Sequence, residues 1–331
     1  MSDEPTDPVP GPPDHPRHTR GSRAEFREQV KSTRADIERQ VQARRAQLDA
    51  TTERIQARTG RNLILAILIG LAFGAVLLVS LIFIKEIFMV VAAASAAFAA
   101  FELTQALRTA GYDIPRIPTI VSAVAIVPAV YFWQENGQLI SIASGILLCW
   151  IWRLILAVVP RRVAATRGLR RDLGAITMIQ VYVVFLASFA ILLLEKPGGQ
   201  WWTLAFIILV VATDTGAYAS GLLFGKHPMA PTISPKKTWE GFAGAAVAGL
   251  VAGVILSIFM LQQPWWFGLI FGVVMLLTAT LGDLTESLIK RDIGVKDMSS
   301  WLPGHGGFLD RLDSILPSAV AAFALFLIFA K

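Results

Sequence analysis

The sequence predicts an all-α, polytopic integral membrane protein with about nine transmembrane helices and a cytoplasmic N-terminus. Three observations indicate this class. Hydrophobic residues make up 54% of the 331 residues and charged residues only 16%, whereas soluble domains carry roughly 25% charged residues. The mean hydropathy is +0.58, which is more apolar than a soluble core of this size can bury. Finally, the apolar residues are gathered in runs long enough to cross a bilayer.

The first element, residues 1–61, is predicted to be a charged, partly disordered cytoplasmic tail. It opens with a proline-rich stretch between residues 5 and 16, a composition that cannot bury an apolar core. Between residues 23 and 58, apolar side chains recur at helical spacing. This segment is either an amphipathic helix that rests on lipid headgroups or a neighbouring helix, or a solvated charged helix without a catalytic role.

Residues 62–331 are predicted to form a membrane-embedded catalytic domain. Its apolar runs mostly meet or approach the roughly 17–25 residues that a spanning helix needs. The runs are 62–84, 87–106, 117–133, 138–159, 173–194, 201–223, 241–262, 265–282 and 314–330.

The distribution of basic residues between these runs predicts the orientation. With the N-terminus inside, the outer connecting segments contain only Lys85, Lys196 and Lys331, and the other connecting lysines and arginines fall on the inner side. Cytoplasmic loops carry such an excess. Arg153 falls inside a run, and we expect its long side chain to reach the cytoplasmic interface.

Composition also excludes several kinds of site. A single cysteine, Cys149, excludes a disulfide framework and a cysteine-based zinc site. Four histidines argue against a multi-histidine metal centre. The net charge of +6 does not indicate a nucleic-acid partner, because most of the chain is predicted to lie in lipid.

Acidic residues gather in the C-terminal third, on the predicted cytoplasmic side. They are Asp214, Glu240, Asp283, Glu286, Asp292, Asp297, Asp310 and Asp313. Carboxylates are costly near lipid unless cations or water accompany them. The same segment is rich in lysine and arginine, and a mixture of carboxylates and bases suits a divalent cation bound to a polyphosphate.

Spacing narrows the candidate metal ligands. Asp283, Glu286 and Lys290 stand at i, i+3 and i+7, on one face of a helix that continues the eighth run. Asp310 and Asp313 stand at i and i+3, on one face of the helix that begins the ninth run. Two such helix ends could supply oxygen ligands for Mg²⁺. The alternative is a pair of solvated helix faces.

The segment between the sixth and seventh runs contains Ser234, Lys236, Lys237 and Thr238. Adjacent lysines with hydroxyl groups suit a polyphosphate, and Thr238 is placed to cap the following helix. The alternative is a basic loop that only anchors topology.

Two further features are weaker on their own. The sequence from Gly304 to Gly307 is glycine-rich enough to present backbone N–H groups to a phosphate, but it also suits an ordinary turn. Asp214 lies inside an apolar run, where it is either functional or a packing residue bonded to Thr213 or Tyr218.

Together these residues resemble a known family. The segments 287–291, 296–297 and 302–313 resemble the signature of the CDP-diacylglycerol synthases, also called phosphatidate cytidylyltransferases, without departure across residues 287–313. Residues 214–218 and 234–241 are similar to the upstream motifs of that family. The resemblance covers roughly residues 62–331 and leaves out the tail.

The resemblance implies an all-helical, homodimeric enzyme of the cell membrane whose active site faces the cytoplasm among membrane lipids. It implies Mg²⁺, leaves a second cation open, and implies that CTP and phosphatidic acid react to give CDP-diacylglycerol and pyrophosphate. Motif matching assigns the metal to Asp283, Asp310 and Asp313. The chemistry of phosphoryl transfer adds Lys290 and Arg311 as expected catalytic residues, because it requires cationic groups that neutralise phosphate charge. The expected substrate-binding residues are Asp214, Ser234, Lys236, Lys237, Thr238, Glu240, Ser287, Arg291, Lys296, His305, Gly306 and Gly307.

Three other functions stay open at this point. A CTP-dependent polyprenol or dolichol-type kinase would transfer the γ-phosphoryl group instead. An ion-coupled transporter would use Asp214 and Asp283 as coupling sites, although the charges gather at one membrane face and no inverted repeat is visible. A membrane scaffold that recruits partners through its tail would leave the acidic cluster unexplained.

Overall fold

The computed structural model describes residues 74–158, 168–295, 298–299 and 307–330. All of them lie within one compact unit, Leu65–Lys331. The predicted tail, most of the first apolar run, and the candidate residues Lys296, His305 and Gly306 lie outside the described residues.

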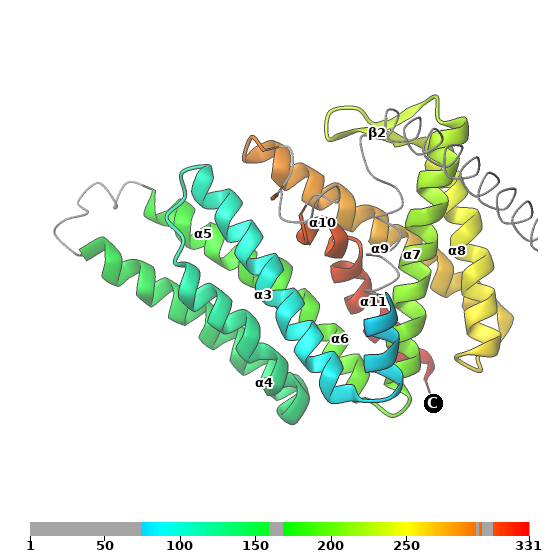
Figure 1. The fold of residues 1–331 in the computed structure, drawn as a ribbon, viewed down its shortest axis with the longest axis horizontal. Helices are drawn as coiled ribbons and strands as arrows, with labels where there is room; N and C mark the ends of the chain where they lie inside the picture. Colours follow the sequence, from blue (N-terminus) through cyan, green and yellow to red (C-terminus); the bar gives the residue numbers. More distant parts are fainter. Residues whose placement is uncertain (1–73, 159–167, 296–297, 300–306, 331) are drawn as a thin grey trace, which may run out of the picture. The chain divides into compact units, whose positions relative to one another are not determined.

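Within the described residues, seven helices are long and apolar enough to cross a membrane. They confirm an all-helical, multi-pass protein (Figure 1). The helices are α3 (Lys85–Thr109), α4 (Arg116–Val158), a continuous segment of α5 (Leu169–Ile179), the π-helix η2 (Gln180–Phe185) and α6 (Leu186–Glu195), then α7 (Gly199–Phe224), α8 (Trp239–Phe259), α9 (Trp265–Asp292), and the pair α10 (Leu309–Leu312) and α11 (Ile315–Phe329).

The long helix α4 folds back on itself. Gln134 has a left-handed φ of 49° and interrupts the helix. The hydroxyl of Thr119 lies 3.7 Å from the sulfur of Cys149, although a continuous helix would separate these residues by about 45 Å. Two antiparallel arms therefore correspond to the predicted runs 117–133 and 138–159, and Figure 1 shows them side by side.

Glycines allow α8 and α9 to pack closely. A Cβ on Gly268 would lie 2.6 Å from the carbonyl oxygen of Gly253, and one on Gly272 would lie 2.7 Å from that of Gly249. Such backbone contact is typical of helix pairs in membranes. Lipid gives no hydrophobic driving force for helix association, so the helices depend on the close packing that small residues allow. α8 also packs against α7, so the ends of α7 and α9 that carry acidic residues are held in one group of helices.

The segment between α7 and α8 is a β-hairpin rather than the predicted loop. Strands β1 (Pro228–Ala230) and β2 (Ser234–Thr238) pair antiparallel. A strand is recognised in a sequence by alternating apolar and polar residues. These strands are too short to show that alternation, so the sequence did not predict them. The predicted cap is confirmed, because the hydroxyl of Thr238 accepts the N–H of Gly241 at 3.1 Å. As a result α8 begins at Trp239, before the predicted run.

Arg153 pairs with buried and half-exposed carboxylates, one of them in the predicted inner connecting segment between α3 and α4, and its reach to the cytoplasmic interface stays a prediction. Its side chain is 1% exposed, and its Nη2 lies 2.7 Å from Asp172 Oδ2 and 3.8 Å from Asp113 Oδ2. Asp172 also accepts the backbone N–H of Asp113 at 3.1 Å. A buried guanidinium needs carboxylates around it, and α5 and the α3–α4 connection supply them.

We expect Asp172→Asn to lower the free energy of unfolding by about 1.5–3 kcal/mol, because it weakens a buried charge-assisted pair. The change should appear as a lower melting temperature in detergent. Asp292→Asn, an exposed change at the end of α9, should shift stability by no more than about 0.5 kcal/mol. Equal melting temperatures for both variants would contradict a stabilising role for the buried pair.

Candidate active site

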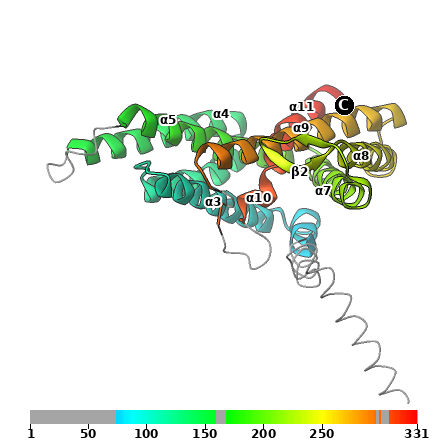
Figure 2. The ribbon, with the colours of Figure 1, turned by 90° about the horizontal axis from the view of Figure 1, so that it is seen from above.

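The ion pairs among the charged residues singled out in the sequence lie where α9, α10 and β2 approach one another. Seen from two directions, α10 lies between α9 and α3 (Figures 1 and 2). Close approach is possible because Gly282 lacks a side chain, since a Cβ there would lie 2.1 Å from the carbonyl oxygen of Asp313. The glycine therefore lets α9 contact the α10–α11 junction directly.

One part of the site joins the β-hairpin to α9. The Nζ of Lys237 lies 2.6 Å from Asp283 Oδ2. The hydroxyl of Ser287, one turn further along α9, donates to Asp283 Oδ1 at 3.4 Å. Two motifs that are far apart in sequence are thus in contact through Lys237 and Asp283. The Asp283 side chain is 34% exposed.

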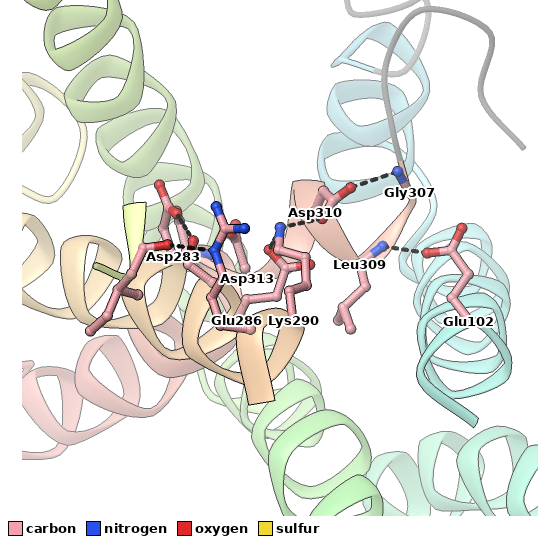
Figure 3. Close-up of polar contacts among 12 residues, drawn as sticks. Glu102, Asp283, Glu286, Lys290, Gly307, Leu309, Asp310 and Asp313 are labelled. Carbon is pink, nitrogen blue, oxygen red and sulfur yellow. Dashed lines mark hydrogen bonds and ion pairs between the residues drawn. The ribbon is translucent and has the colours of Figure 1, made fainter. Parts of the chain in front are cut away.

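A second part joins α9 to α10 through Lys290. Its ammonium group donates to Glu286 Oε2 at 2.9 Å and to Asp310 Oδ1 at 2.8 Å. The other oxygen of Asp310 accepts the N–H of Gly307 at 2.7 Å. Figure 3 shows Lys290 between the two carboxylates. The spacing argument is confirmed for Glu286 and Lys290, which lie on one helical face.

Asp313 lies deeper in the same region. It is buried, and its Oδ1 accepts the N–H of Ser314 at 2.6 Å. Asp214 on α7 and Asp283 on α9 are close enough to interact electrostatically with it. The expected helix from Asp310 onward is confirmed, because Leu309–Phe329 forms one membrane-length helical segment. Asp310 lies on α10 and Asp313 directly follows it. Asp313 and Ser314 keep right-handed helical backbone angles, so α10 leads straight into α11 at Ile315.

The remaining candidate residues surround this group. Lys236, Arg291 and Arg311 are exposed. The Nε of Arg291 donates to the carbonyl of Ile233 in the hairpin at 3.2 Å, and Arg311 is close enough to offset the charge of Asp214. Basic groups thus border the carboxylates on the side of the hairpin.

Glu240 lies at the base of the hairpin. Its carboxylate accepts the backbone N–H groups of Lys226 at 3.1 Å and His227 at 3.2 Å, and its Oε1 lies 2.5 Å from Nδ1 of His227. It therefore fixes the start of the hairpin that carries Ser234 and the lysine pair.

Sequence reasoning missed Glu102 on α3. Its side chain is 3% exposed and accepts the N–H of Leu309 at 2.8 Å through Oε2. Its other oxygen accepts the hydroxyl of Ser299. The sequence did carry a signal for this residue, because Glu102 is a lone acid inside an apolar run. A charged side chain is costly in a membrane helix and therefore indicates a functional role.

The donor set suits a hard cation and a polyanion. Among the described residues, no three acidic, histidine or cysteine side chains already stand as a metal site, and Asp283 and Asp310 are each paired with a lysine. However, Oε1 of Glu286 is buried without a hydrogen-bond partner in the described part of the chain. A cluster of carboxylate oxygens with unused acceptor capacity is the donor chemistry that Mg²⁺ prefers.

Comparisons of the sequence with known proteins identify the family to which the chain belongs. The sequence model of the cytidylyltransferase family matches residues 64–329. A phosphatidate cytidylyltransferase of Mycobacterium bovis is 42% identical over 272 residues, which cover 81% of this chain and 89% of that protein. A protein of the same name from Mycobacterium leprae is 41% identical over 276 residues, covering 81% and 88%. One from Haemophilus influenzae is 46% identical over 136 residues, covering 40% and 47%.

Proposed function

We infer that this chain, which belongs to the cytidylyltransferase family, is a phosphatidate cytidylyltransferase. It converts CTP and phosphatidic acid into CDP-diacylglycerol and pyrophosphate, and so supplies phospholipid synthesis. The observation that carries this conclusion is the 42% identity to the Mycobacterium bovis enzyme over 81% of the chain. The grouping of Asp283, Lys290 and Asp310 at one place in the fold supports it.

The reaction needs a nucleophile, an electrophile and charge neutralisation. An oxygen of the phosphatidate monoester attacks the α-phosphorus of CTP in line, a new P–O bond forms, and the bond to the β-phosphate breaks to release pyrophosphate. The monoester is already anionic near neutral pH, so catalysis depends on positioning and electrostatics rather than on a general base. Lys237, Lys290 and Arg311 are placed among the carboxylates to neutralise phosphate oxygens.

Mg²⁺ completes the proposed site. Asp283, Asp310 and Asp313 are the proposed ligands, and Asp214 and Glu286 offer oxygens for a second cation. A bound Mg²⁺ supplies neutralisation of the charge on the CTP phosphates. If Asp283 and Asp310 held the cation, the lysines that pair with them, Lys237 and Lys290, would be free to contact phosphate oxygens. The unpaired oxygen of Glu286 supports this assignment.

The membrane arrangement is also proposed. The excess of lysine and arginine in alternate connecting segments supports a cytoplasmic N-terminus, about nine spanning helices and an active site that faces the cytoplasm. The reversal within α4 supports counting it as two spans. We propose a homodimer in the cell membrane, on the basis of the family resemblance.

The decisive test uses purified protein with Mg²⁺ and CTP labelled at the α- or the γ-phosphate. With phosphatidate as acceptor, we expect only the α-label to enter lipid, and pyrophosphate to be released. Transfer of the γ-label to phosphatidate, or to a polyprenol in a parallel reaction, would instead indicate a lipid kinase. Absence of transfer from either label would contradict an enzyme of this kind.

A further inference from the structure

A buried carboxylate from α3 holds the chain where the acidic helix α10 begins. Glu102 accepts the N–H of Leu309 at 2.8 Å, a contact that joins residues 207 positions apart. Figure 3 shows the Glu102 side chain directed at Leu309, next to Asp310. Four residues before Glu102, the ring of Phe98 packs on Phe308 with centroids 5.9 Å apart. One face of α3 therefore contacts both residues that precede Asp310.

The contact with Glu102 gives the backbone N–H of Leu309 a hydrogen-bond acceptor that the neighbouring residues do not supply. The first N–H groups of any helix lack partners within that helix. The residue before α10, Phe308, makes no capping hydrogen bond with its side chain. Leu309 is fully buried, so an unpaired N–H there would be costly. Glu102 supplies the acceptor from another helix, in place of the usual serine, threonine or aspartate cap.

The same carboxylate limits where Asp310 can stand. A Cβ on Gly307 would lie 3.0 Å from Glu102 Oε2 and 3.2 Å from Asp310 Oδ2. The backbone of Gly307 therefore fits between the two carboxylates, and its N–H is directed to Asp310 at 2.7 Å. Glu102 also binds Ser299. These contacts fix the start of α10 while Lys290 holds Asp310 from the opposite side.

We propose that Glu102 is a positioning residue for the cytidylyl transfer, which acts by capping α10 from α3 and so orienting Asp310. This inference rests on the proposed function. Glu102 contacts backbone and a serine hydroxyl rather than the α9 carboxylates, so it acts through α10. Loss of the cap lets α10 shift and moves Asp310 out of register with α9, whereas the β-hairpin and its lysines stay in place.

Three Glu102 variants and a control test the proposal. Glu102→Ala removes the acceptor and should lower kcat by roughly 5–150-fold, the cost of one unsatisfied buried donor, with the KM for CTP changed less than about threefold. Glu102→Gln keeps an oxygen for Leu309, and the Ser299 hydroxyl can turn to accept from the amide, so most of kcat should return. Glu102→Asp is too short to reach both partners and should behave like Glu102→Ala. Glu86→Gln makes the same chemical change at an exposed position, about 24 Å away along α3, and should leave kcat unchanged.

Hydrogen exchange provides a readout that does not depend on turnover. Peptides covering residues 307–313 should exchange faster in Glu102→Ala and Glu102→Asp than in wild type or Glu102→Gln, with peptides from the hairpin unchanged. Wild-type kcat or unaltered exchange at 307–313 in a folded Glu102→Ala or Glu102→Asp protein would overturn the proposal. If Glu102→Ala does not fold, the Asp and Gln variants decide it. A wild-type protein that transfers no α-label would refute the proposed function instead, while the exchange measurement would still test the cap.

Discussion

Asp310→Asn is expected to reduce turnover by roughly 10²–10³-fold, the scale seen when one electrostatic group is removed from a preorganised site. Asparagine keeps the shape of aspartate and one oxygen but removes the charge that holds a hard cation. It also weakens the 2.8 Å contact with Lys290. Asp283→Asn and Asp313→Asn should behave alike, because all three carboxylates belong to the proposed Mg²⁺ site.

Titration with Mg²⁺ separates the two causes of this loss. If cation binding is weakened, a higher Mg²⁺ concentration should recover part of the turnover in at least one of the three variants. If only the placement of Lys290 is disturbed, Mg²⁺ should have no effect. Asp292→Asn is the matched control, because Asp292 lies at the same end of α9 but is exposed. Near-normal rates for Asp310→Asn and Asp313→Asn at limiting Mg²⁺ would refute the metal assignment.

Lys237→Gln is expected to lower kcat/KM for CTP by roughly 10–150-fold, because a charge-assisted contact to phosphate contributes about 1.5–3 kcal/mol. Lys237 is placed for this role by β2, which brings its Nζ within 2.6 Å of Asp283. Lys236 is more exposed, so Lys236→Gln should have a smaller effect. The measurement is initial rate against CTP concentration at saturating phosphatidate.

Lys226→Gln is the control for charge and topology. Lys226 carries the same charge in the same connecting segment, but the contact it makes with Glu240 uses its backbone N–H, which the substitution leaves intact. Its kcat/KM should stay within about threefold of wild type, because an exposed surface charge contributes little. If both variants lose activity equally and both insert poorly, the lysines serve membrane topology rather than phosphate binding.

The sequence by itself determined the membrane-length helices that the structure describes and most of the acidic residues at the candidate site, but not Glu102. Within lipid the backbone must satisfy its own hydrogen bonds, so an apolar run of sufficient length becomes a helix wherever it packs. This is why the runs 201–223 and 241–262 match α7 and α8 closely, whereas α9 begins with the run 265–282 and continues to Asp292. Helical spacing likewise fixed the shared face of Glu286 and Lys290, because residues four apart are neighbours in any helix.

Only the tertiary structure decided which partners meet. Apolar helices are alike in hydropathy. The hydropathy pattern therefore identifies a polar residue inside an apolar run, but not the helix that supplies its hydrogen-bond or ion-pair partner. Glu102 contacts Leu309, which lies 207 residues further along the chain, and Arg153 pairs with Asp172 on another helix. The contact between Lys237 and Asp283 was likewise not predictable from the sequence. It depends on a β-hairpin whose strands are too short to show a periodic pattern. Long-range contacts of this kind depend on how the helices pack, and packing in lipid is set by close fit and hydrogen bonds between segments that a linear pattern does not record.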